Sequence, residues 1–134
     1  MIVYQFSYTC EEKDLKEIMD KNKIIYERKT INLKMDYINL PKKYNRESTH
    51  HRAMKGSVVD YLKNIGEPNP LLEYGYLDVY APTLGVVVEC GDTPVSRIIS
   101  VVNNFENLKE LWTVDIDFGK NDNYELIVFR KKNA

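Results

Sequence analysis

The sequence predicts a single domain of the α/β class, on three observations. The chain has 134 residues, the length of one ordinary domain, and 43% of them are apolar, which is enough for one core. Segments with the apolar spacing of amphipathic helices alternate with short segments rich in Val, Ile, Phe and Tyr, as expected for helices packed on a sheet. No internal repeat or low-complexity tract divides the chain. Residues 1–134 are therefore expected to form one domain.

The charge and the cysteine content narrow the classes of protein that fit. The net charge is −1, so the chain as a whole is not committed to nucleic acid, and any basic binding surface must be local. Cys10 and Cys90 lie far apart, which predicts reduced thiols in a cytoplasmic protein and neither a disulfide framework nor a zinc site. The start of the chain lacks a signal-peptide pattern, and no apolar run is long enough to cross a membrane, so no membrane contact is expected.

The first third of the chain predicts a strand, a helix and a second extended segment. Residues 2–8 alternate and are rich in Val, Tyr and Phe, which is typical of a strand. Residues 11–22 place acidic side chains in a first helical turn and apolar ones on one stripe, which predicts a short helix. Residues 24–40 have an extended pattern, and the polar stretch 42–49 after Pro41 predicts a loop with the densest positive charge in the chain.

The remaining two thirds predict the order helix, strand, strand, helix, strand, strand. These elements are expected over residues 49–65, 73–80, 85–90, a helix that starts near 94, 108–116 and 124–129. Gly66, with two prolines behind it, ends the first of these helices. Asp92, Thr93 and Pro94 predict the start of the second, because Asp or Thr can cap a helix and Pro suits its first position.

Two carboxylates lie on the antiparallel hairpin that the first two of these strands are expected to form. With Tyr80 opposite Gly85, Asp78 would lie opposite Val87 and would share a face with Glu89. Asp78 and Glu89 would then be diagonal neighbours roughly 7–8 Å apart, which suits two carboxylates that bind one hard divalent cation. The alternative is that both lie at strand ends, where solvent or lysines satisfy them.

The region from residue 50 to residue 115 resembles the core of the PD-(D/E)XK nuclease superfamily. That core consists of a helix, a strand with Asp, a strand with Glu-x-Lys, a helix and a further strand. The segment 51–66 is similar to the first core helix of resolvase-like members, with Tyr61, Leu62 and Gly66 at matching places. The resemblance implies a restriction-endonuclease-like core, in which helices flank a central mixed sheet.

In this resemblance the core covers residues 49–134, and residues 1–48 form an N-terminal strand-helix-strand extension. Asp78 matches the motif aspartate, although Leu77 stands where the motif has proline, and Glu89 matches the motif glutamate. The family then implies Mg²⁺ or Mn²⁺ held by Asp78, Glu89 and the carbonyl of Cys90, acting on a phosphodiester.

The motif lysine is missing, because Gly91 stands at its position. In that family the lysine orients or deprotonates the attacking water and offsets charge in the transition state. Two residues could replace it: Lys55, on the sheet-facing stripe of the helix over 49–65, and Arg97, one turn into the next helix. The alternatives are that Lys55 packs its stem on the sheet with its amine in water, and that Arg97 is solvated. His51 lies one turn before Lys55. His50 and His51 could be metal ligands, but adjacent histidines at a helix start are expected to be exposed.

A basic loop is the candidate surface for phosphates. It consists of Lys42, Lys43, Arg46 and Arg52. The alternative is an ordinary solvated loop.

The function expected first is Mg²⁺- or Mn²⁺-dependent cleavage of DNA phosphodiesters, with Asp78 and Glu89 as metal ligands and Lys55 or Arg97 in the role of the lysine. A second interpretation keeps the fold without the chemistry, as a nucleic-acid-binding or assembly module, and Gly91 favours it. A third is a protein-interaction domain without nucleic acid, which fits the near-neutral charge. The sequence leaves both a monomer and a homodimer open.

Overall fold

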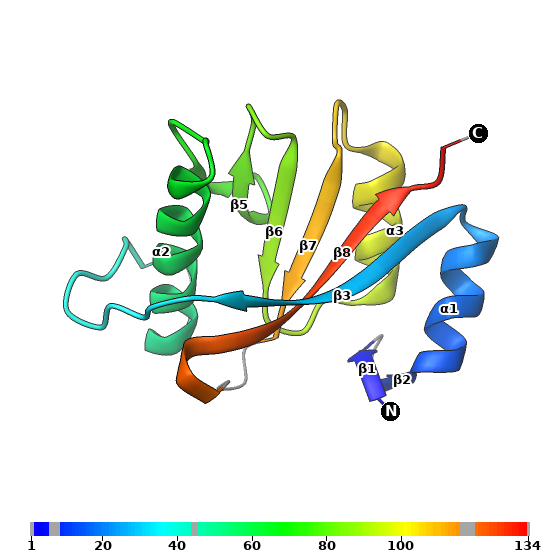
Figure 1. Cartoon of the computed structure of the whole chain (residues 1–134), viewed down its shortest axis with the longest axis horizontal. Helices are drawn as coiled ribbons and strands as arrows, with labels where there is room; N and C mark the ends of the chain where they lie inside the picture. Colours follow the sequence, from blue (N-terminus) through cyan, green and yellow to red (C-terminus); the bar gives the residue numbers. More distant parts are fainter. Residues whose placement is uncertain (1, 6–8, 44–45, 116–119, 134) are drawn as a thin grey trace.

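The centre of the protein is a six-stranded mixed sheet, seen in a computed structural model that describes residues 2–5, 9–43, 46–115 and 120–133 (Figure 1). Its strands, in the order β3-β8-β7-β6-β5-β4, are β3 (Ile24–Asn32), β8 (Asn123–Lys131), β7 (Glu110–Val114), β6 (Val86–Cys90), β5 (Leu77–Ala81) and β4 (Leu71–Tyr74). Strands β6 and β7 run parallel, whereas the other neighbours run antiparallel.

Helices cover both faces of this sheet. They are α1 (Glu12–Lys21), α2 (Thr49–Asn64) and α3 (Val95–Asn104). Figure 1 shows α2 on one side and α1 and α3 on the other, and the burial alternates to match: Val86 and Val88 pack with α2, whereas Val87 packs with α3. The predicted α/β class is therefore confirmed. None of the helices in the described ranges combines the length and the apolar character that a membrane crossing requires.

The N-terminal third joins the main sheet through β3. This strand pairs with β8 along nine residues, so the segment expected as an extension supplies an edge strand. Ahead of it, β1 (Ile2–Gln5) and β2 (Thr9–Glu11) form a separate two-stranded hairpin in place of the expected single strand; residues 6–8 lie outside the described residues. Beyond β3, the Asp36 carboxylate accepts hydrogen bonds from the backbone N–H groups of Ile38 and Asn39, which turns the chain where extended structure was expected.

The hairpin of β5 and β6 has a register two residues away from the predicted one. Tyr80 lies opposite Val87, not opposite Gly85. The reason is that Gly85 belongs to the turn: its φ of +71° is in the left-handed region, and its N–H donates to the carbonyl of Ala81. Pairing therefore runs from Ala81 and Val86 to Val79 and Val88, and it ends one residue before Asp78 and Glu89.

The two helix starts that border the site differ in how they are capped. The Ser48 side chain caps α2 by accepting a hydrogen bond from the His51 N–H. No side chain caps α3, so the cap predicted from Asp92 or Thr93 is wrong. The Thr93 hydroxyl instead donates to the Gly91 carbonyl, which closes the turn between β6 and α3.

Candidate functional site

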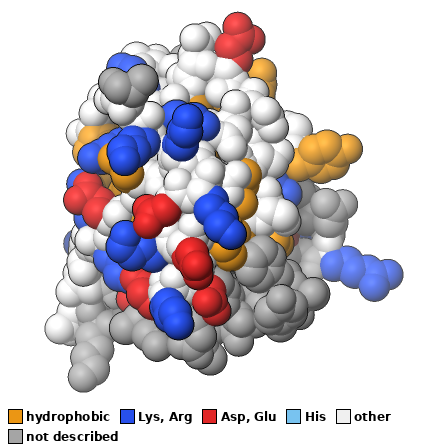
Figure 2. Space-filling model, turned by 90° about the vertical axis from the view of Figure 1, so that its right-hand side faces the viewer, with side chains coloured by type: hydrophobic (Ala, Val, Ile, Leu, Met, Phe, Trp, Pro, Cys, Tyr) orange, Lys and Arg blue, Asp and Glu red, His pale blue; other side chains and the backbone are white. Residues whose placement is uncertain are grey.

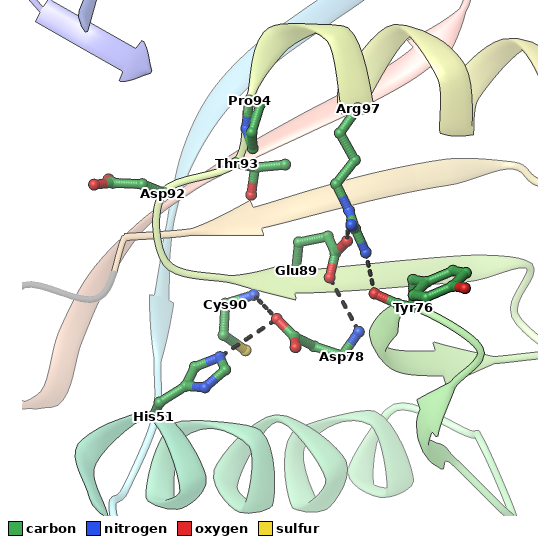
Figure 3. A pocket seen from close by; sticks show the side chains of 9 residues that line it. All are labelled: His51, Tyr76, Asp78, Glu89, Cys90, Asp92, Thr93, Pro94 and Arg97. Carbon is green, nitrogen blue, oxygen red and sulfur yellow. Dashed lines mark hydrogen bonds and ion pairs between the residues drawn. The ribbon is translucent and has the colours of Figure 1, made fainter. Parts of the chain in front are cut away.

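A pocket of about 230 Å³ opens where β5 begins and β6 ends, between the first turns of α2 and α3 (Figure 3). Its lining residues are His51, Tyr76, Asp78, Glu89, Cys90, Asp92, Thr93, Pro94 and Arg97. The structure thus brings together both predicted carboxylates, the predicted backbone ligand and one of the two predicted cations. Lys55 does not line it.

Glu89 is the most buried carboxylate of the pocket, with 5% of its side chain exposed. It follows the apolar residues of β6, and the alternation of that strand directs it to the α3 side. Oε1 accepts a hydrogen bond from Arg97 Nε at 2.5 Å, and Oε2 accepts one from the backbone N–H of Asp78 at 3.0 Å. Burial raises the pKa of Glu89 to about 7 and the Asp78 charge adds to this, whereas the Asp78 N–H and Arg97 oppose it. Glu89 can therefore exchange a proton near neutral pH.

Asp78 lies beside Glu89 but turns its carboxylate toward α2 (Figure 3). Its Oδ2 accepts a hydrogen bond from the Cys90 N–H at 2.8 Å and lies 3.5 Å from His51 Nε2. Burial raises the pKa of Asp78, but His51, the Cys90 N–H and the charge of Lys55 outweigh burial, so the pKa lies below its ordinary value. The two carboxylates meet in one pocket on neighbouring strands, as predicted, but not by rising from a shared face of the sheet.

His51 is a pocket residue that the sequence interpretation missed, because it was expected to be exposed. Only 20% of its side chain is exposed, and Nδ1 lies 3.1 Å from Glu47 Oε2. Nε2 faces Asp78, is buried and makes no hydrogen bond to the described residues. The Asp78 contact raises the pKa of His51, and Glu47 adds to this, although burial and Lys55 lower it. Its place one turn before Lys55, on the same helical stripe, was the signal in the sequence.

Lys55 faces the sheet, as predicted, but it does not serve the pocket. Its side chain is fully buried, with Nζ 2.6 Å from Glu47 Oε2 and 2.5 Å from Glu73 Oε1. The expectation that it stands in for the lysine beside Asp78 and Glu89 is therefore corrected, and so is the alternative with its amine in water. Burial lowers the pKa of Lys55, but its hydrogen bonds with Glu47 and Glu73 outweigh this and raise it, so the amine is charged. Lys55 thus holds Glu47, which in turn contacts His51.

Arg97 is the predicted cation that does reach the carboxylates. Its guanidinium binds Glu89 and also donates to the carbonyl of Tyr76. The alternative of a fully solvated Arg97 is therefore wrong. At the motif position itself, Gly91 is buried and has a φ of +93°, and its N–H donates to the Val114 carbonyl at 2.8 Å.

The donor atoms of the pocket fit a small, hard cation. In the described part of the chain, no three His, Cys, Asp or Glu side chains gather as a ready-made metal centre. Mg²⁺ does not require one, because it is commonly held by one or two carboxylates and keeps several waters. Asp78 Oδ1 makes no hydrogen bond to the described residues (Figure 3). Burial raises the pKa of the Cys90 thiol well above its usual range, so a thiolate ligand from Cys90 is not expected.

The four predicted basic residues divide into two groups. Lys42, Lys43 and Arg46 are exposed, whereas Arg52 is half-buried and donates through Nη2 to the Pro41 carbonyl at 2.6 Å. Arg52 therefore holds the loop onto α2. On the side where α1 lies, Lys and Arg side chains are interspersed with Asp and Glu and do not form a field of one sign (Figure 2). Of the described surface, the loop and not this side remains the candidate for phosphates.

Outside evidence does not add to this geometry. Comparisons with protein-family models, curated proteins and solved structures find no match to the chain.

Proposed function

We propose that the protein is a metal-dependent phosphodiesterase that acts on DNA, with Asp78 and Glu89 as the ligands of Mg²⁺ or Mn²⁺. One observation carries the proposal: two neighbouring carboxylates share a pocket while their pKa values are displaced in opposite directions. Displaced pairs of this kind are typical of sites that perform acid and base chemistry. A histidine and an arginine border the same space.

The arrangement of elements supports the proposal. The resemblance to PD-(D/E)XK nucleases implies a helix, a strand with Asp, a strand with Glu, a helix and a further strand. The chain has α2, then β5 with Asp78 and β6 with Glu89 as antiparallel neighbours, then α3, and then β7 parallel to β6. Strand β4 precedes β5 and pairs with it.

Each pocket residue has a role in this proposal. Asp78 is ionised near neutral pH and offers Oδ1, and Glu89 offers its carboxylate once it has released its proton. A bound Mg²⁺ would supply Lewis-acid chemistry, by lowering the pKa of a water and offsetting phosphate charge. Arg97 presents a permanent positive charge to the phosphate, and His51, whose ring nitrogens face Asp78 and Glu47 and whose pKa is raised, can add a second positive charge beside it. His51 and Arg97 together would thus replace the missing lysine.

A second function is favoured by the ion pair between Arg97 and Glu89. This pair compensates the charge of Glu89, and the Cys90 N–H and His51 contact Asp78, all without a cation. On that basis the chain would be a binding module that keeps the nuclease-like arrangement and does not cleave.

A titration separates the two functions. Mg²⁺ and Mn²⁺ are titrated by calorimetry into the wild type, Asp78→Asn, Glu89→Gln and Asp60→Asn, the last being an exposed carboxylate on α2 as control. Cleavage is assayed with both metals on single-stranded, duplex and branched DNA. If the protein is a metal-dependent enzyme, Asp78→Asn and Glu89→Gln lose metal binding and cleavage. Asp60→Asn keeps both.

Arg97→Gln completes the design. If the wild type binds no metal and Arg97→Gln does, the guanidinium occupies the place of the cation and the binding module is correct. If the wild type binds metal and cleaves, and Arg97→Gln cleaves about 10²-fold more slowly, Arg97 stabilises charge in the transition state.

A further inference from the structure

An apolar groove of about 380 Å³ adjoins the carboxylate pocket. Leu77, Val101 and Phe105 contribute apolar surface to it, and Tyr74 and Tyr76 contribute aromatic rings. Tyr76 and Arg97 line both the groove and the pocket, so the two form one continuous depression.

Three aromatic rings beside the groove pack against one another. The Tyr80 ring packs 4.9 Å from that of Tyr74 and 5.0 Å from that of Phe105, centroid to centroid. The Tyr76 side chain is 90% exposed, while its carbonyl is held by the Arg97 guanidinium. A large exposed ring on an anchored turn offers contact area at a low cost in conformational entropy.

The chemistry of the pocket and that of the groove together point to one class of ligand. In the pocket, Arg97 and the two carboxylates form a place for a phosphate and a cation. In the groove, which shares Arg97 and Tyr76 with the pocket, the surface is aromatic and apolar. A nucleotide carries an anionic phosphate and a flat aromatic base within one unit, and any nucleobase can stack on a tyrosine ring.

We propose that this groove binds a nucleobase of the strand whose phosphate lies in the carboxylate pocket, with Tyr76 as the stacking residue. The inference rests on the proposed function for the identity of the pocket. It also narrows the substrate: a base in an intact duplex is already stacked and paired, so the site takes single-stranded nucleic acid or an unpaired end.

Binding without metal tests the groove separately from the chemistry. In EDTA, fluorescence anisotropy compares a labelled oligothymidine with the same strand carrying abasic sites and with a blunt duplex of equal length. The proteins are the wild type, Tyr76→Ala, Tyr76→Phe and, as a control for loss of an exposed apolar side chain, Ile38→Ala, which removes a residue 91% exposed. Cleavage of the single strand is then measured in Mg²⁺ and Mn²⁺ for the same four proteins.

Tyr76→Ala is expected to weaken binding of the intact strand about 5- to 150-fold, the effect of losing one stacked base. Tyr76→Phe and Ile38→Ala should remain within about twofold of the wild type, and the abasic strand and the duplex should bind weakly to all four proteins. Binding that depends on Tyr76 without cleavage sustains the groove and rejects the nuclease. Cleavage by Tyr76→Ala at the wild-type rate and affinity, or no preference for bases over abasic sites, overturns the groove and leaves the nuclease standing. Absence of any binding also overturns the groove.

Discussion

Raising the pH from 5 to 8 is expected to destabilise the folded protein, because Glu89 must then lose its proton inside the pocket. The pKa of this carboxyl is about 7 in the folded protein, against an ordinary value of 4.5 that applies to the unfolded chain. Between these values the folded state holds a proton that the unfolded chain has released. The stability that this proton provides is complete below about pH 4.5 and is lost as the pH rises through about 7.

The expected loss of stability follows from the linkage between proton binding and folding. Each pH unit between the two pKa values corresponds to about 1.4 kcal/mol, so the whole difference is about 3 kcal/mol, of which about 2 kcal/mol falls between pH 5 and pH 8. His51 acts in the same direction, because its raised pKa provides stability that is lost at higher pH. Asp78 acts in the opposite direction but contributes only in acid, since its pKa is lowered. The window from pH 5 to pH 8 therefore isolates Glu89 and His51.

Urea unfolding at pH 5, 6, 7 and 8, without metal, measures this loss. Glu89→Gln keeps an oxygen to accept the Asp78 N–H bond and removes the titration, so its stability should fall by about 2 kcal/mol less than that of the wild type over the window. Glu106→Gln, which changes an exposed glutamate just after α3, should follow the wild type. Equal losses in the wild type and Glu89→Gln would show that Glu89 takes up no proton on folding, and the reasoning about the pocket would be wrong.

Four further outcomes are expected. Lys55→Met should lower the free energy of unfolding, measured in urea, by about 3–5 kcal/mol, because two carboxylates lose their buried cation. Lys63→Met, on the exposed side of the same helix, should lower it by less than about 0.5 kcal/mol. Similar values for the two variants would contradict the ion-pair network of Lys55 with Glu47 and Glu73. Arg52→Ala should lower the free energy of unfolding by about 1–3 kcal/mol and leave the salt dependence of DNA binding unchanged. Alanine at the three exposed loop cations should flatten that salt slope by up to about 0.9 per contact, and an unchanged slope would exclude the loop. Metal affinity, measured by calorimetry, should rise up to about tenfold per pH unit until about pH 7, because binding displaces the Glu89 proton; an affinity independent of pH would exclude Glu89 as a ligand.

The sequence was informative where the signal is local. The apolar stripe and the glycine stop of α2 predicted its bounds to within a residue, and the apolar run that ends at Glu89 predicted β6. These features depend on neighbours within a few positions, which a periodic pattern records. The place of Asp78 and Glu89 on neighbouring antiparallel strands followed from the short turn between those strands.

What the sequence did not reveal depends on backbone dihedrals or on distant contacts. The register of the hairpin was missed because the left-handed conformation of Gly85 assigns that residue to the turn. The partners of Lys55 were missed because Glu73 lies 18 positions away in the sequence. Glu73 is also on β4, which was predicted as part of the same strand as β5. Periodicity carries no information on which charged residues meet across such distances.

The backbone at Gly91 decides how this chain can be related to a nuclease with lysine in its motif. With a φ of +93°, the position accepts glycine and strains any residue with a side chain. A lysine could adopt an ordinary conformation there only if φ rotated, which would displace the turn that follows, including the Gly91 carbonyl that accepts the hydrogen bond from Thr93. The route between the two kinds of site is therefore not one substitution in either direction. It requires a different backbone conformation at the end of β6. A Gly91→Lys variant would therefore test first whether the chain can adopt that conformation, and only then whether the lysine supports catalysis.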